Sequence, residues 1–80
     1  MNPNLLDRLK HAIGRDPEIV VSREDIGTTT GQDPRWLADL GLEKRDLIRL
    51  QRKGFAIKAH YQTKEGPVRV RWIIFKEAVE

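Results

Sequence analysis

Four basic side chains lie close together in one short segment of the chain, "EKRDLIRLQRK" (residues 43 to 53). Lys44, Arg45, Arg49 and Arg52 carry positive charges that bind phosphate, and Arg and Lys can also donate hydrogen bonds to guanine. Two leucines in the same segment recur at a helical interval, so a helix would turn them inward and leave the cations outside. The segment therefore predicts a helix with a basic outer face, suited to an anionic partner.

Charge is unevenly distributed along the chain. Residues 1–40 hold five Lys or Arg against seven Asp or Glu, a net charge of −2, whereas residues 41–80 hold ten against five, a net charge of +5. From Lys44 to Arg71 there are nine basic and two acidic side chains, an excess of +7. Such a basic region is typical of a nucleic-acid-binding face. A solvated surface that happens to be basic is the alternative interpretation.

The composition excludes several classes of protein. The 80 residues predict a single domain over residues 1–80 with a small core, and the absence of cysteine excludes disulfides and cysteine-based zinc sites. The longest apolar runs are far shorter than the roughly 20 residues that cross a bilayer, and the N-terminus does not resemble a signal peptide. We therefore expect a cytoplasmic protein that does not contact a membrane.

Candidate catalytic and ligand-binding residues are few. His11 and His60 are far apart in the sequence and lack the partners of a metal site, and Ser22 has no neighbouring base to activate it. The "GTTTGQ" segment lacks the lysine and the following helix of a phosphate-binding loop. The sequence thus predicts no enzyme activity, no metal, no cofactor and no evident small-molecule ligand.

Helical and strand patterns alternate along the chain. Asp33 and Pro34 form a strong helix start, while Gly41 and Gly54 each mark a helix end. The expected elements are a helix over 3–13, a strand within 18–22, a helical turn ending at 26, a loop over 27–32, helices over 34–40 and 43–53, and a hairpin over 55–75.

The second strand of the hairpin, within "VRVRWIIF", has two different faces. Alternation that keeps Arg69 and Arg71 in solvent also turns Ile73 and Phe75 outward, away from the core. Ile48, which lies between the cations of the basic helix, adds another apolar side chain to the predicted surface. These residues predict either a homodimer through Ile73 and Phe75 or cover supplied by the first helix or the C-terminal tail.

The segment "RWLADLGLEKRDLIRLQRKG" resembles a helix-turn-helix core, and "RLQRKGF" resembles the end of a recognition helix and the entry to a wing. Gly41 falls at the turn, and apolar contact positions of the motif are occupied by Trp36, Leu40, Leu42, Leu47 and Leu50. Leu37 departs from the alanine that is usual in the first helix of the motif. The resemblance to the winged helix-turn-helix superfamily covers residues 5–75 in outline and 34–55 in detail. It implies an α+β fold with three helices, a short strand after helix one, and a C-terminal hairpin as the wing.

This resemblance implies sequence-specific binding of double-stranded DNA by a small transcriptional regulator, with helix 43–53 in the major groove and hairpin 55–75 as the wing. The residues expected to contact DNA are Lys44, Arg45, Arg49, Arg52, Lys64, Arg69 and Arg71. A winged helix that contacts proteins within a replication, defence or transcription assembly is the alternative. An RNA-binding module is a weaker alternative, because the strands lack alternating exposed aromatic residues.

Overall fold

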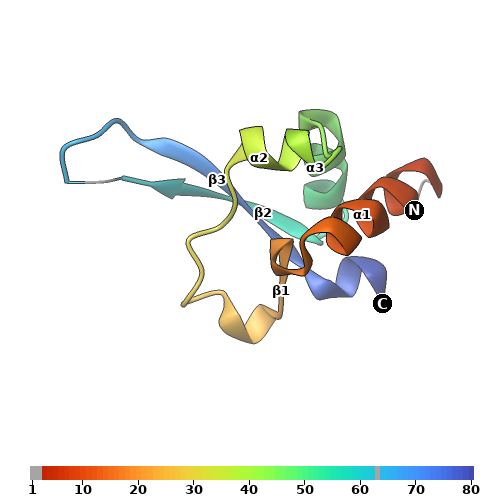
Figure 1. Ribbon diagram of the computed structural model, residues 1–80. Helices are drawn as coiled ribbons and strands as arrows, with labels where there is room; N and C mark the ends of the chain where they lie inside the picture. The colour runs from red at the N-terminus through yellow and green to blue at the C-terminus, as the bar shows by residue number, and fades with distance from the viewer. Residues whose placement is uncertain (1–2, 63) are drawn as a thin grey trace.

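The computed structural model describes residues 3–62 and 64–80, which form an α+β structure with three α-helices and a three-stranded mixed sheet (Figure 1). In chain order the elements are α1 (Pro3–Arg15), η1 (Pro17–Ile19), β1 (Val20–Val21), η2 (Arg23–Asp25), α2 (Pro34–Asp39), α3 (Lys44–Arg52), β2 (Ala56–Tyr61), β3 (Arg69–Phe75) and η3 (Lys76–Val79), where η denotes a 3-10 helix. Each α-helix lies where the sequence predicts it, and the ends differ from the expected ones by one or two residues.

Local capping explains where α2 and α3 begin and end. The Asp33 side chain accepts a hydrogen bond of 2.8 Å from the Arg35 backbone N–H at the start of α2. Gly41 and Gly54 follow the ends of α2 and α3 with φ angles of 98° and 81°. Only glycine adopts this left-handed conformation without strain, so the chain can reverse direction within very few residues after each helix.

The sheet has the order β1-β3-β2, so β3 is the central strand. The short β1 runs parallel to β3, with Val20 opposite Ile74, and β2 runs antiparallel to β3, with Lys58 opposite Trp72. Backbone hydrogen bonds between Gln32 and Trp72 continue the β1 edge of β3. The β2–β3 hairpin extends away from the helices and gives the molecule an elongated shape of 41 × 26 × 23 Å (Figure 1).

The helices and the inner face of β3 share one hydrophobic core. Its fully buried members include Leu5 and Leu9 of α1, Leu37 of α2, Leu50 of α3 and Ile74 of β3. Leu37, which departs from the usual residue of the helix-turn-helix motif, is therefore a core residue. Ile48 is partly buried and packs against the same core, so it does not form the free apolar surface that we expected.

The prediction that Ile73 and Phe75 need cover from a second copy of the chain is wrong. Their side chains are only 5% and 1% exposed, although they do not belong to the core that the helices share. Both faces of β3 are therefore covered within one chain at its C-terminal end. The basis for a homodimer through these two residues is removed.

The outer face of β3 is covered by the segment that follows β1. The Arg23 guanidinium lies 4.2 Å from the centre of the Phe75 ring, forms an ion pair with Glu77 and donates a hydrogen bond to the Gly54 carbonyl. Gly31 approaches the outer face so closely that a Cβ atom would lie 3.3 Å from Cγ1 of Ile73. The sequence predicted this segment as a turn and a loop, but their positions over β3 arise only from long-range packing.

Candidate nucleic-acid interface

The cations of α3 lie on its solvent side in two rows. Lys44 and Arg52 are aligned with Ile48 between them, because residues four positions apart lie on one face of a helix, and Arg45 and Arg49 form the neighbouring row. None of these four basic side chains is buried, while the buried leucines face the core. The helix therefore presents the charged outer face that its sequence predicts.

The orientation of α3 is set by a buried ion pair with α1. The side chain of Asp46 has no exposed surface, and its carboxylate accepts hydrogen bonds from Nε and Nη2 of Arg8, the former at 3.2 Å. It also accepts a 3.0 Å hydrogen bond from the Glu43 backbone N–H, which caps the start of α3. One carboxylate thus joins α1 to the first turn of the basic helix.

The environment of Asp46 keeps its side chain ionised. Burial alone would raise the pKa of this carboxyl, but hydrogen bonds from Arg8 and the Glu43 backbone, with the charges of Arg8 and Arg45, lower it further than burial raises it. The pKa of Asp46 is therefore below its ordinary value, while the hydrogen bond to Asp46 raises the pKa of Arg8. Sequence reasoning counted Asp46 only as an acidic residue within the basic region and missed this role.

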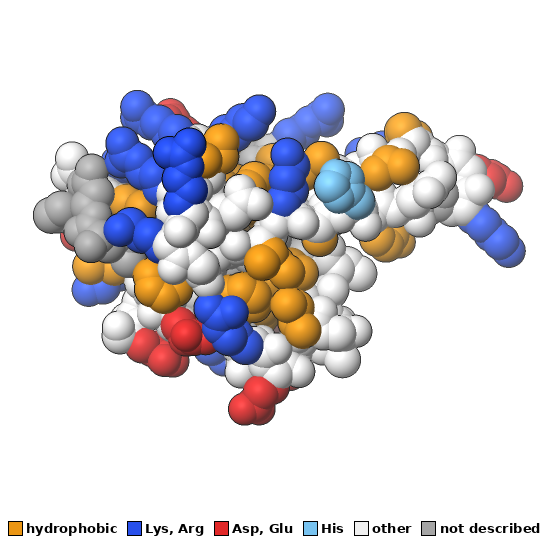
Figure 2. Space-filling model, turned by 180° about the vertical axis from the view of Figure 1, so that it is seen from behind, with side chains coloured by type: hydrophobic (Ala, Val, Ile, Leu, Met, Phe, Trp, Pro, Cys, Tyr) orange, Lys and Arg blue, Asp and Glu red, His pale blue; other side chains and the backbone are white. Residues whose placement is uncertain are grey.

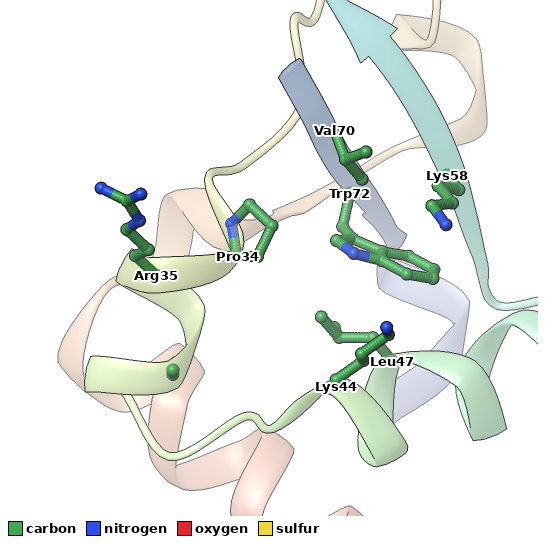
Figure 3. Close-up of a pocket in the computed structure, with 8 residues that line it drawn as sticks. Pro34, Arg35, Lys44, Leu47, Lys58, Val70 and Trp72 are labelled. Carbon is green, nitrogen blue, oxygen red and sulfur yellow. The ribbon is translucent and has the colours of Figure 1, made fainter. Parts of the chain in front are cut away.

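An open groove of about 430 Å³ lies where α2, α3 and the hairpin meet (Figure 3). Its floor is mainly apolar and its rim is basic. The lining residues are Pro34, Arg35, Ala38, Lys44, Leu47, Lys58, Val70 and Trp72. Lys44 is thus close to two cations, Arg35 and Lys58, that we did not predict as site residues.

The two faces of the hairpin differ in their relation to the helices. Lys58 is paired with the buried Trp72 in the sheet, so both lie on the face that meets α2 and α3. Arg71 is paired with Ala59 on the opposite face, where its guanidinium lies 5.5 Å from the centre of the Tyr61 ring. Arg71 is therefore not brought together with the cations of the groove, although the sequence grouped it with them.

The remaining two predicted hairpin cations occupy different positions. Arg69 lines a shallow pocket with Asp33, Pro34, Arg35 and Val70, so the fold brings it beside the start of α2. Lys64 is exposed in the turn between β2 and β3. The register of β2 against β3 decides these positions, and the alternation of residue types along each strand does not reveal that register.

Several cations of this surface have no carboxylate partner within the described residues. Among residues 3–62 and 64–80, the ion pairs join Arg8 to Asp46, Arg23 to Glu77, and Arg45 to Glu43. Lys44, Arg49, Arg52 and Lys58 are in none of them. In Figure 2, Lys and Arg side chains gather along the upper side, over the helices and the base of the hairpin, whereas several acidic side chains lie along the lower left.

Two other kinds of site find no support in the described residues. In this part of the chain, no three His, Cys, Asp or Glu side chains are grouped as metal ligands. No helix among the described residues is both long enough and apolar enough to span a bilayer.

Comparison of the chain with protein-family models, curated proteins and solved structures found no match. Functional inference for this protein therefore starts from its own residues and their geometry.

Proposed function

We propose that this protein binds double-stranded DNA in a sequence-specific manner, as a small winged-helix regulator of transcription. The observation that carries the proposal is that cations from three elements, Arg35 of α2, Lys44 of α3 and Lys58 of β2, line one groove. The basic row of α3 continues from this groove along the solvent side of the helix. A surface of this kind suits a polyanion with regularly spaced charges.

The dimensions of α3 suit the DNA major groove. Its nine residues give a length of about 13.5 Å, at about 1.5 Å per residue, and the major groove of B-form DNA is about 12 Å wide. In this arrangement Lys44, Arg45, Arg49 and Arg52 approach base edges and phosphates, with the N-terminal end of α3 leading. The ion pair between Arg8 and Asp46 supports the proposal because it fixes the helix that would enter the groove.

The hairpin acts as the wing through the face that meets the helices. Lys58 and Arg69 then contact the phosphate backbone beside Arg35, while Lys64 at the turn reaches a neighbouring phosphate. Arg71 contributes less, because its side chain lies on the opposite face over Tyr61. These assignments distinguish Lys58 from Arg71, which the sequence alone ranks in the opposite order.

Fluorescence anisotropy with a labelled duplex, over a salt series from about 50 to about 200 mM, tests the proposal. We expect DNA affinity to weaken steeply with salt. The slope of log affinity against log salt should flatten by about 0.9 for each phosphate that Lys44→Gln/Lys58→Gln no longer neutralises. Lys10→Gln/Lys76→Gln is the matched control, because it removes two exposed cations elsewhere. Arg8 is unsuitable for a control because its replacement leaves Asp46 buried without its partner.

Sequence specificity is tested by selection from a random duplex library. A selected site should lose affinity by about 1–3 kcal/mol for each base pair that a side chain of α3 reads, and substitutions of that side chain should relax the preference at that position. Absence of duplex binding at low salt would refute the proposal and favour a winged helix that contacts proteins. Equal weakening in the groove variant and its control would refute the assignment of the groove to DNA.

A further inference from the structure

We infer that the groove between α2, α3 and the hairpin binds a small amphipathic carboxylate, whose apolar body lies on the groove floor. The floor is formed by Leu47, Val70 and Trp72, with Pro34 and Ala38 completing the walls. No acidic side chain lines the groove, and its three charged residues are all basic. This combination of an apolar floor with a few charges of one sign is typical of sites that orient a small ligand by a single polar group.

The size of the groove favours a small molecule over a protein partner. Its volume of about 430 Å³ falls in the range of about 300–1,000 Å³ that ligand sites occupy. A stable protein interface needs about 800 Å² from each partner, whereas the apolar surface here is confined to five residues within a basic rim. A flat aromatic or short branched body fits this space, and a long alkyl chain would extend into solvent.

The two lysines define where the carboxylate lies. Figure 3 shows Lys44 of α3 and Lys58 of β2 on the same side of the groove as the Trp72 indole, whereas the Arg35 guanidinium points away from the cavity. A carboxylate between Lys44 and Lys58 would leave the attached apolar body against the Trp72 and Leu47 side chains. The lysines give the site its preference for anions, and the floor gives it a preference for apolar bodies over simple ions.

Such a ligand would also connect two functions, and this step rests on the proposed DNA binding. Lys44 belongs both to the groove and to the basic row of α3, so a bound carboxylate would neutralise a charge that DNA needs. Occupancy of the groove would therefore weaken DNA binding. By reciprocity, bound DNA would weaken binding of the carboxylate by the same factor.

Isothermal titration of the full chain with 2-naphthoate, without DNA, tests the site directly. We expect saturable binding that is about tenfold weaker in Lys44→Gln/Lys58→Gln and within about twofold of wild type in Lys10→Gln/Lys76→Gln. Ala38→Leu should also weaken binding, because Ala38 is an exposed lining residue whose enlargement fills the groove without altering charge. Circular dichroism of each variant confirms that the fold is retained.

Two further probes separate the alternatives. The cation 2-naphthylmethylammonium should bind at least about tenfold more weakly than 2-naphthoate, because it carries the wrong charge. Equal affinity for both probes, absence of saturable 2-naphthoate binding, or unchanged affinity in the lysine and Ala38 variants would each overturn the inference. Tighter binding of a short acidic peptide with one tryptophan, in place of 2-naphthoate, would assign the groove to a protein partner instead.

The DNA experiment is independent of this titration. If 2-naphthoate binds as expected and the protein binds no duplex, the ligand site stands and the proposed function fails. If the protein binds duplex and 2-naphthoate does not bind, the proposed function stands and the ligand site fails. If both bind, 2-naphthoate should raise the apparent Kd for DNA in the wild type and not in Ala38→Leu.

Discussion

Replacement of Asp46 by asparagine tests how α3 is held against α1. Asparagine has nearly the same shape, and its Oδ1 can still accept the hydrogen bond from the Glu43 backbone, so the change mainly removes the charge that Arg8 binds. Hydrogen bonds to charged groups each contribute about 1.5–3 kcal/mol, and Arg8 regains water because a third of its side chain is already exposed. We therefore expect a decrease of about 2 kcal/mol in the free energy of unfolding.

The magnitude can be measured by thermal and urea denaturation followed by circular dichroism. For a domain of this size about 2 kcal/mol corresponds to a decrease in Tm of about 8–16 °C. Arg45→Met is the matched control, because it breaks an exposed ion pair with Glu43 at the same end of α3 and should change stability little. Arg8→Met should destabilise more than Asp46→Asn, since it leaves a fully buried carboxylate without its partner.

The pH dependence has a defined sign. Because the pKa of Asp46 is lower in the folded state than in the unfolded chain, its ionisation stabilises the wild type above the unfolded pKa of about 3.9. This stabilisation is lost as pH falls through the folded pKa. In Arg8→Met the carboxyl stays buried without its cation, so its pKa rises and the difference from wild type should shrink at low pH. A stability of Asp46→Asn within about 0.5 kcal/mol of wild type, or a pH-independent effect of Arg8→Met, would refute this reasoning.

Three further predictions follow from the packing around β3. Gly31→Ala should cost about 1–3 kcal/mol, measured by urea denaturation, because φ is +79° and a Cβ would lie 3.0 Å from the Arg71 Cβ; Gly14→Ala, where nothing lies within 4 Å, is the control. Phe75→Lys should unfold the protein rather than dissociate a dimer, so a folded variant by circular dichroism would contradict its burial. Lys58→Gln should flatten the salt dependence of DNA binding more than Arg71→Gln, and equal effects would argue against different roles for the two hairpin faces.

The sequence by itself determined the helices and their ends. The cap at Asp33, the two glycines after α2 and α3, and the spacing of leucines act over a few residues, so their effects can be inferred without the fold. The charged outer face of α3 follows from the same local periodicity. For these features the controlling interactions are nearly all between residues close together in the sequence.

Tertiary structure decided which of the cations lie together and which apolar residues are covered. Lys58 meets Lys44, and Arg71 lies on the other face, because the β2–β3 register places Lys58 opposite Trp72. Phe75 is covered because Arg23, far earlier in the chain, folds over its ring. The pairing of Arg8 with Asp46, 38 positions apart, is likewise invisible in local patterns. These contacts depend on how separate elements pack, and residue spacing within one element carries no information about that packing.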